Sequence, residues 1–315
     1  MSIAEGDKVS VCANCGKGEE ESGNLKACTA CKLVKYCNRE CQIAHRPQHK
    51  KECKKRASEL HDIELFKQPP PKEDCPICIL LLPTLWTGHR YMTCCGQLIC
   101  SGCVHAPVYD QHGNEMPKKT CPFCRTPFPK STVENTQRKM KRVEAKDAQA
   151  MHSIGCCYAA GKDGFPEDDA KALELWHRAA ELGHAPAYVN IAYAYDYGNG
   201  VEVDKKKSIR YFELAAMGGD MYARCVLGNL EYNADRALKH HMIAVAGGHT
   251  DSLNKVEELY SKRLGNATKD DYNKAVQSYQ TYLDEIKSIQ RDKAAEYNEE
   301  YRYYGIDYLT NGDGY

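Results

Sequence analysis

Residues 12–53 read CANCGKGEEESGNLKACTACKLVKYCNRECQIAHRPQHKKEC, and this stretch decides how the N-terminal part of the chain folds. Zinc binds four sulphur or nitrogen ligands tetrahedrally, and C-x2-C is its usual half-site. Four pairs of such ligands predict two closed sites, which leave no position for water or substrate and so favour a structural role. The pairs are Cys12 with Cys15, Cys28 with Cys31, Cys37 with Cys41, and His49 with Cys53.

This pattern resembles the MYND zinc finger at all eight ligand positions and at Tyr36, which precedes the third pair. The resemblance implies that the pairs interleave and that a proline-rich peptide can bind the module. It also implies two ligand sets. One set is Cys12, Cys15, Cys37 and Cys41, and the other is Cys28, Cys31, His49 and Cys53.

The alternative for this stretch is a secreted module held by disulfides. The histidine among the ligands favours zinc, and no signal peptide precedes Cys12. A segment this short buries too little apolar surface to fold alone, and zinc binding would supply on the order of 10 kcal/mol or more per site. We therefore expect the ions to hold this module together.

A second block of eight cysteines follows after a short gap. Its order and outer spacings resemble an all-cysteine variant of the RING finger over residues 75–129, and the resemblance again implies two interleaved sets. One set is Cys75, Cys78, Cys100 and Cys103, and the other is Cys94, Cys95, Cys121 and Cys124. The two blocks together predict about four zinc ions per chain.

The second block departs from the usual RING pattern at two places. Cys94 and Cys95 are adjacent, so both bind one ion only if the backbone accepts strain. Otherwise one of them is replaced by His89, His105 or His112. The tryptophan that often recruits ubiquitin-conjugating enzymes is missing between Cys103 and Cys121, and Trp86 lies earlier instead.

Three residues match recruiting positions of RING-type ubiquitin ligases. Ile77 lies between the first two ligands, Pro122 follows the seventh, and Arg125 follows the eighth. In the resembling ligases a cation at this last position contacts both the conjugating enzyme and ubiquitin. A planar guanidinium suits that contact better than an ammonium group does.

The whole sequence of 315 residues suffices for two or three compact domains. Its 43 basic and 43 acidic residues balance, so the overall charge gives no reason to expect nucleic-acid binding. Fifteen of the 18 cysteines lie between Cys12 and Cys124, and so many free thiols predict a reducing compartment, cytosol or nucleus. No apolar run reaches the roughly 18 residues of a membrane helix, so we expect no membrane partner.

Three other segments lie before the repeats. Residues 1–11 are predicted to be a flexible lead, and residues 54–74 a helix followed by a stiff spacer at Pro69–Pro71. Residues 130–149 predict one basic linker helix that packs onto the repeats. The apolar residues Val133, Met140 and Val143 fall near one face of that helix.

From residue 150 the sequence repeats with a shift of 36 positions. Trp176 corresponds to Phe212, and Asp168 to Asp204. This period predicts stacked helix pairs, and the pattern resembles the Sel1-like repeat, a relative of the tetratricopeptide repeat, over residues 150–284. The third unit is shortened and the fourth is weak. Residues 285–315 predict a helix that caps the stack, followed by a tail.

The second helix of the first unit illustrates the expected packing. Its apolar residues recur every three or four positions and predict one buried face. Asp168 or Asp169 can cap the start of the helix, and Gly183 can end it in a left-handed turn. The face comprises Ala172, Leu175, Trp176, Ala179 and Ala180.

The expected fold class is therefore two small zinc-stabilised α+β modules, MYND and RING-like, followed by an all-α solenoid of Sel1-like helix pairs. Two functions remain open. One is a non-catalytic adaptor whose modules bind peptides or proteins. The other is a RING-type ubiquitin ligase, which would position a conjugating enzyme while the solenoid recruits the substrate. No constellation of residues predicts a covalent catalytic site.

Overall fold

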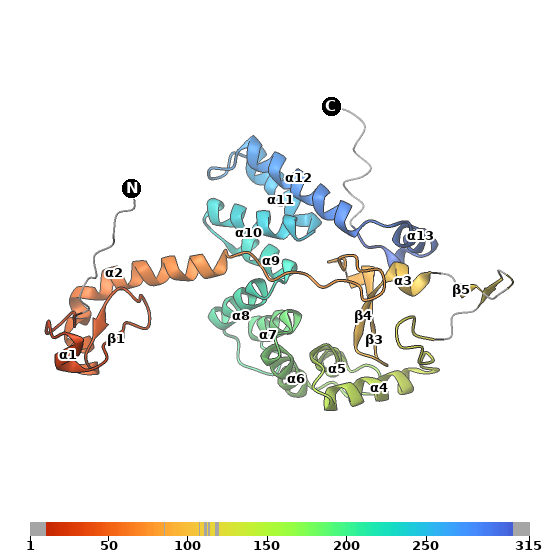
Figure 1. The fold of residues 1–315 in the computed structure, drawn as a ribbon, viewed down its shortest axis with the longest axis horizontal. Helices are drawn as coiled ribbons and strands as arrows, with labels where there is room; N and C mark the ends of the chain where they lie inside the picture. Colours follow the sequence, from red (N-terminus) through yellow and green to blue (C-terminus); the bar gives the residue numbers. More distant parts are fainter. Residues whose placement is uncertain are drawn as a thin grey trace. The chain divides into compact units, whose positions relative to one another are not determined.

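A computed structural model describes residues 11–84, 86–106, 108–109, 112, 114–116 and 120–304 of the chain (Figure 1). Most of the predicted lead and the tail after residue 304 lie outside these residues. The chain divides into two compact units, Met1–Lys67 and Gln68–Tyr315. Within the described residues, no helix is both long and apolar enough to cross a membrane.

The first unit contains a small hairpin and one long helix. Strands β1 (Lys26–Ala27) and β2 (Lys35–Tyr36) pair antiparallel, after the single-turn helix α1 (Glu19–Ser22). Helix α2 (Arg39–Leu65) begins at Asn38, whose side chain accepts a hydrogen bond from the Cys41 amide. The buried cluster of this unit is small and consists largely of the predicted ligands. It comprises Cys12, Leu25, Cys28, Cys31 and Tyr36.

The second unit starts with the RING-like residues 75–129, which we call the second zinc module. Its hairpin pairs β3 (His89–Met92) with β4 (Gln97–Cys100), and helix α3 (Ser101–His105) follows directly. Turn η1 (Trp86–Gly88) precedes the hairpin, and a small outlying pair joins β5 (Val108–Tyr109) to β6 (Glu115–Met116). Met92 and Ile99 are buried among the cysteines.

A helical solenoid forms the rest of this unit. Successive helices pack as antiparallel neighbours, α5 with α6, α7 with α8, α9 with α10 and α11 with α12. The helices are α4 (Thr132–Glu144), α5 (Ala148–Ala160), α6 (Asp169–Glu181), α7 (Ala185–Tyr197), α8 (Lys205–Met217), α9 (Met221–Leu230), α10 (Ala234–Ala246), α11 (Thr250–Ser261), α12 (Lys269–Ile286) and α13 (Ile289–Tyr297), followed by turn η2 (Glu299–Tyr301).

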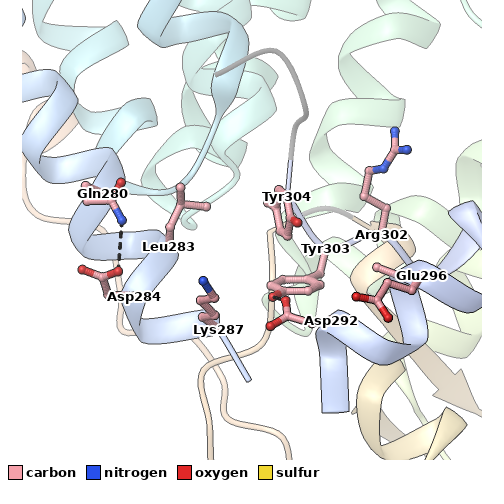
Figure 2. A pocket seen from close by; sticks show the side chains of 10 residues that line it. Gln280, Leu283, Asp284, Lys287, Asp292, Glu296, Arg302, Tyr303 and Tyr304 are labelled. Carbon is pink, nitrogen blue, oxygen red and sulfur yellow. Dashed lines mark hydrogen bonds between the residues drawn. The ribbon is translucent and has the colours of Figure 1, made fainter. Parts of the chain in front are cut away.

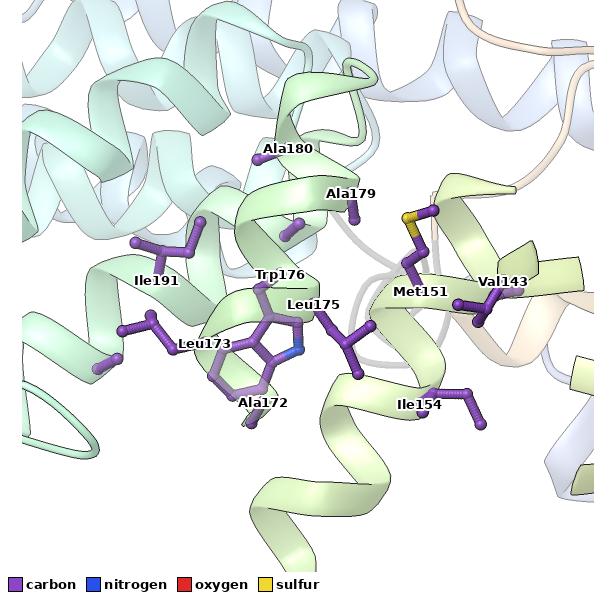
Figure 3. Packing of buried hydrophobic residues seen from close by; sticks show 13 residues of the cluster. Val143, Met151, Ile154, Ala172, Leu173, Leu175, Trp176, Ala179, Ala180 and Ile191 are labelled. Carbon is purple, nitrogen blue, oxygen red and sulfur yellow. The ribbon is translucent and has the colours of Figure 1, made fainter. Parts of the chain in front are cut away.

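The predicted buried face of α6 is confirmed. Trp176 lies at the centre of a cluster that α6 shares with α5 and α7 (Figure 3). Asp168 caps α6 by accepting a hydrogen bond from the Lys171 amide, and Gly183 adopts a φ of 85° after the helix end. The cluster also takes in Met151, Ile154 and Ile191 from the neighbouring helices. The core of the first helix pairs therefore contains the face that the periodicity predicted, together with Val143 of α4.

Two helices differ from the sequence-based expectation. Residues 130–149 form no single helix, because the chain turns at Lys146, which has a φ of 59° between α4 and α5. Of the three apolar residues expected on one face, only Val143 is buried, whereas Val133 is 66% exposed. The predicted capping helix from residue 285 onwards is shorter than expected, running as α13 from Ile289 to Tyr297, and α13 packs against α3 of the second zinc module.

The segment that contains the predicted spacer, residues 68–84, is anchored on the solenoid. Lys72 donates a hydrogen bond to the Gly247 carbonyl at 2.6 Å, and its ammonium group lies 4.2 Å from the centre of the Tyr282 ring. Thr84 donates to the same carbonyl through its hydroxyl and to the Tyr282 hydroxyl through its amide. Burial lowers the pKa of Lys72 to about 8. The spacer is thus fixed by contacts far along the chain.

Replacing Gly155 tests how closely α5 and α6 pack. A Cβ at Gly155 would lie 2.6 Å from Nε1 of Trp176. We expect Gly155→Ala to lower the free energy of unfolding of the second unit by about 1–3 kcal/mol through overpacking, although alanine favours a helix by about 1 kcal/mol. Urea denaturation at constant zinc concentration measures the change.

The control is Ser153→Ala in the same helix, for which we expect an unchanged or slightly higher stability. A Gly155→Ala variant as stable as Ser153→Ala would show that the two helices do not approach as closely as described.

Candidate metal centres

The structure brings the sixteen predicted ligand residues together in four groups of four. Within each group the ligand atoms lie within 4.8 Å of one another. We name each group by its first residue. They are the Cys12 group (Cys12, Cys15, Cys37, Cys41), the Cys28 group (Cys28, Cys31, His49, Cys53), the Cys75 group (Cys75, Cys78, Cys100, Cys103) and the Cys94 group (Cys94, Cys95, Cys121, Cys124).

The spacing of the sulphur atoms fits a tetrahedral zinc ion. With a Zn–S bond of about 2.3 Å, neighbouring ligands of a regular tetrahedron lie about 3.8 Å apart. Sγ of Cys28 lies 3.8 Å from Sγ of Cys53, and Sγ of Cys78 lies 3.7 Å from Sγ of Cys100. These separations far exceed a disulfide bond of about 2.05 Å, and the cysteines are free. The cysteine clusters thus indicate zinc binding.

Four of the C-x2-C pairs share one backbone turn. In each turn the residue after the second cysteine has a left-handed φ, and its amide donates to the carbonyl of the first cysteine at 2.9–3.0 Å. The turn directs both thiol groups to the same side. Glycine adopts this conformation without strain, whereas a β-branched isoleucine rarely does. The four residues are Gly16, Lys32, Ile79 and Arg125.

The adjacent pair Cys94 and Cys95 lies in a turn of a different kind. The amides of Cys95 and Gly96 both donate to the Met92 carbonyl, and Gly96 takes the left-handed φ of 74°. Both sulphur atoms face the same group, Cys94 towards Cys124 at 3.4 Å and Cys95 towards Cys121 at 3.9 Å. Gly96 thus accommodates the sharp change of direction that adjacent ligands require.

Two of the histidines that could replace one of these cysteines have other partners. A ring nitrogen of His89 lies 3.2 Å from the Pro83 carbonyl, and burial lowers the pKa of His89. The ring of His105 lies against those of Tyr297 and Tyr301. The geometry therefore favours two cysteines as the ligands, and their binding of zinc remains a prediction.

Local polar groups favour the ionised form of one thiol in each group, whereas burial and the neighbouring Cys28 raise the pKa of others, such as that of Cys53 to about 11. A hydrogen bond with the Thr126 hydroxyl lowers the pKa of Cys124 to about 6. Burial alone would raise the pKa of Cys12. Hydrogen bonds from backbone amides, chiefly that of Cys15, have the larger opposite effect, so the pKa of Cys12 is lowered. Because the thiolate is the form that binds metal, these contacts suit a zinc site.

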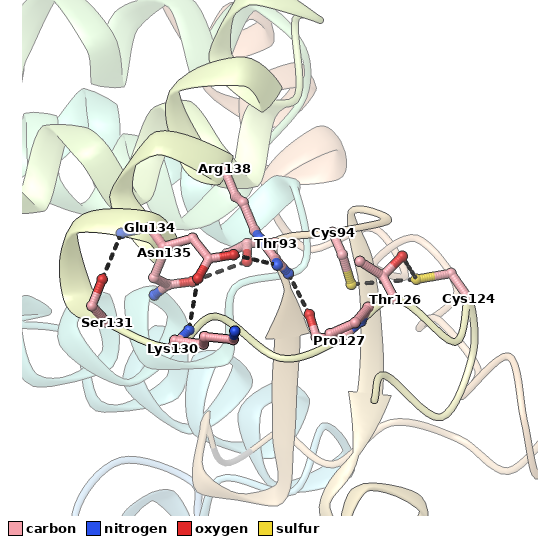
Figure 4. Close-up of polar contacts among 10 residues, drawn as sticks. All are labelled: Thr93, Cys94, Cys124, Thr126, Pro127, Lys130, Ser131, Glu134, Asn135 and Arg138. Carbon is pink, nitrogen blue, oxygen red and sulfur yellow. Dashed lines mark hydrogen bonds and ion pairs between the residues drawn. The ribbon is translucent and has the colours of Figure 1, made fainter. Parts of the chain in front are cut away.

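Helix α4 holds the outer edge of the second zinc module in place (Figure 4). Arg138 donates to the Pro127 carbonyl at 2.7 Å, and the Thr93 hydroxyl donates to the Asn135 side chain at 2.9 Å. Arg142 donates to the carbonyl of Cys94, one of the ligand residues. Sequence reasoning missed these contacts, because α4 showed only a basic pattern without any sign of its partners.

The residues proposed to contact ubiquitin enzymes lie on two turns of the second zinc module. Ile77 is 39% exposed, Pro122 is partly exposed and Arg125 is exposed. Arg125 shares its backbone conformation with Lys32 of the first unit, so the turn alone accounts for that conformation. Trp86 is 79% exposed. The structure thus leaves these side chains accessible without assigning them a partner.

One cluster in the solenoid combines residue types of a cysteine hydrolase. The Asn190 amide lies 3.0 Å from Nε2 of His152 and 3.3 Å from Sγ of Cys156. Burial raises the pKa of Cys156 and lowers the pKa of His152 to about 3. A thiolate–imidazolium pair is therefore disfavoured, and the cluster is a packed polar contact between α5 and α7.

A cavity of about 490 Å³ lies between α12 and the segment that follows it (Figure 2). Its charged residues carry both signs, and Tyr303 turns towards Asp292, to which its hydroxyl donates a hydrogen bond. Asp284 bonds the Gln280 amide instead. This mixture resembles a solvated seam between two elements more than a cofactor site.

Comparison with known proteins identifies two parts of the chain. The family model of the MYND finger matches residues 12–53. The family model of the Sel1 repeat matches twice, at residues 148–184 and at residues 185–220. Protein sel-1 homolog 2 of Mus musculus is 28% identical over 118 residues, which are 35% of this chain and 17% of that protein. The chitin synthase regulator SKT5 of Saccharomyces cerevisiae is 33% identical over 93 residues, which are 29% of this chain and 13% of that protein.

The chain thus spans less than a fifth of the length of these relatives. Among solved structures, a Sel1 repeat protein from Oxalobacter formigenes is 26% identical, with a TM-score of 0.43 over 49% of this chain and 66% of that chain. The Escherichia coli protective antigen c5321, which displays an SLR fold, is 24% identical, with a TM-score of 0.43. The match covers 55% of this chain and 37% of that chain. This chain therefore carries a MYND finger at residues 12–53 and Sel1 repeats in its helical solenoid.

Proposed function

We propose that this chain is a zinc-dependent adaptor that binds other proteins through its MYND finger and its solenoid. The observation that carries the proposal is the composition of the four groups. Each offers four protein ligand atoms within 4.8 Å of one another, so an ion bound by all four has no open position for a substrate. The MYND finger and the Sel1 repeats themselves indicate protein–protein interaction.

Zinc would have a purely structural role in such an adaptor. Among the described residues of the first unit, the buried cluster contains two that are not ligands, Leu25 and Tyr36, and so small a core needs metal to stay folded. Because the ligand thiols must stay reduced, we place the protein in the cytosol or nucleus. The partners at the MYND finger are proline-rich peptides, by its likeness to that family, and the solenoid binds proteins.

The first test is the zinc content. Protein purified under reducing conditions should contain about four zinc ions per chain by elemental analysis. Cys28→Ser, which removes a ligand of the Cys28 group, should bind about one ion fewer, because three ligands hold zinc far more weakly than four. A wild-type content of two would mean that one module does not bind metal.

The matched control is Cys225→Ser. Cys225 is buried in α9, outside the four groups, so this variant should keep the full zinc content. Equal losses in both variants would show that the loss reflects unfolding and not a missing ligand.

The second test concerns the partner of the MYND finger. A fluorescent library of proline-rich peptides is titrated with the full chain, and fluorescence anisotropy reports binding. We expect micromolar binding of some sequences by wild type and by Cys225→Ser, and none by Cys28→Ser. Equal binding by Cys28→Ser would exclude the folded finger as the site, and no binding to any peptide would contradict this partner class.

The ligase is the alternative function, and the exposure of Ile77 is the observation that favours it. Its test mixes the full chain with activating enzyme, a panel of conjugating enzymes, ubiquitin and ATP. Ubiquitin chains that form with wild type and disappear with Arg125→Ala would support a ligase. The adaptor proposal expects no chains with any conjugating enzyme. Lys32→Ala, which alters the equivalent turn in the first unit, is the control variant.

A further inference from the structure

The last described segment of the chain lies against the second zinc module. We call residues 288–304 the C-terminal clasp. Its helix α13 packs on α3, the helix that carries the ligand Cys103. The Ser101 hydroxyl donates to the Tyr301 carbonyl at 3.1 Å, and the Thr87 hydroxyl donates to the Arg302 carbonyl. The clasp therefore covers the face of the module that contains the Cys75 group.

Arg291 of the clasp reaches into this group. Its guanidinium donates to the Leu81 carbonyl at 2.8 Å and to the Ile286 carbonyl at 2.7 Å. Its second terminal nitrogen points at Sγ of Cys78, at 3.8 Å. Cys78 belongs to the Cys75 group, so a residue more than two hundred positions away contacts a predicted zinc ligand.

Helices α3 and α13 approach each other closely at Gly102. A Cβ on Gly102 would lie 2.8 Å from both Cγ and the backbone nitrogen of Arg291. Any larger residue at Gly102 would push α13 away from α3. Tyr303, further along the clasp, is 1% exposed and holds Asp292 through its hydroxyl (Figure 2). The clasp thus holds Arg291 in a fixed position.

The electrostatics of Arg291 explain why a guanidinium lies there. Arg291 is fully buried, and a buried cation is costly unless it is paired. In the described part of the chain, its guanidinium meets backbone carbonyls and ligand sulphurs of the Cys75 group. A zinc ion with four thiolates carries about two negative charges, which would supply the missing counter-charge. The guanidinium of Arg142 also approaches a ligand residue, but there it donates to the carbonyl of Cys94 at 3.1 Å.

We propose that Arg291 is a positioning residue for the Cys75 group, through which zinc binding and docking of the clasp stabilise each other. The inference rests on the proposed binding of zinc by this group. The four thiolates with bound zinc carry a net negative charge that attracts the guanidinium and with it the clasp, and the docked clasp in turn strengthens zinc binding. Such coupling is reciprocal, so zinc and the clasp must stabilise each other by the same factor.

The test compares three replacements of Arg291 in the full chain. Arg291→Gln and Arg291→Met remove the positive charge. Arg291→Lys keeps the charge but replaces the planar guanidinium by an ammonium group. Zinc release into increasing concentrations of a chelator is followed for each. We expect one of the ions to leave Arg291→Gln and Arg291→Met at concentrations at least tenfold lower than in wild type, the usual size of effects from groups around a metal ligand. Arg291→Lys should lie between them and wild type.

Arg302→Gln is the matched control, because Arg302 lies in the same clasp. Among the described residues, its side chain bonds the neighbouring Glu299 and not a ligand residue. It should release zinc as wild type does. Wild-type release by Arg291→Met would overturn the proposal, because an apolar side chain would then serve as well as the charge. A wild-type chain with no zinc in the second zinc module would instead refute the proposed function.

Hydrogen exchange gives an independent readout that does not depend on how well the Arg291 variants fold. In Cys75→Ser, which lacks one ligand of the group, amides of residues 289–301 should exchange at least tenfold faster than in wild type. Amides of α2 in the first unit serve as the internal reference and should not change. Unchanged protection of the clasp in Cys75→Ser would show that zinc and the clasp are not coupled.

Discussion

The fold depends on sets of four ligands that converge on shared centres. Sulphur and nitrogen atoms at tetrahedral spacing take the place that a hydrophobic core has in a larger domain. In the first unit the ligands are themselves most of the buried residues, and few other apolar side chains are available to replace them. In the second zinc module the cysteines are half of the buried cluster, and the other half is Leu82, Met92, Ile99 and Val104.

The two zinc modules differ in how they are supported. The MYND finger continues into the long helix α2 and forms a compact unit by itself. The second module is not independent in this way, because three parts of the same unit contact it or the segment before it. Arg138 of α4 bonds one edge, and Arg291 of the clasp bonds another face. Lys72, in the segment that precedes the module, bonds the solenoid. Metal centre and solenoid therefore form one folding unit, and a partner of the solenoid would bind a surface that the zinc module helps to shape.

Local patterns explain which features could be predicted. The C-x2-C pairs are recognisable because a turn places both thiols on one side, and the repeat is recognisable because Trp176 and Phe212 recur with one period. The break at Lys146 was missed because residues 130–149 contain no glycine or proline to mark a turn, although Asp147 caps the start of α5 by accepting a hydrogen bond from the Ala150 amide. The contact of α13 with α3 was missed for a different reason, because it joins elements far apart in the sequence.

The sequence by itself determined the ligand pairs, the helix pairs of the solenoid and their capping residues, because each depends on neighbours within one or two turns of chain. Only the tertiary structure decided that the second zinc module is embedded in the solenoid unit and that Arg291 lies beside Cys78. The physical reason is that contacts between residues two hundred positions apart depend on how whole elements pack. A buried arginine on a short helix carries no local sign of the sulphur atom that it will meet.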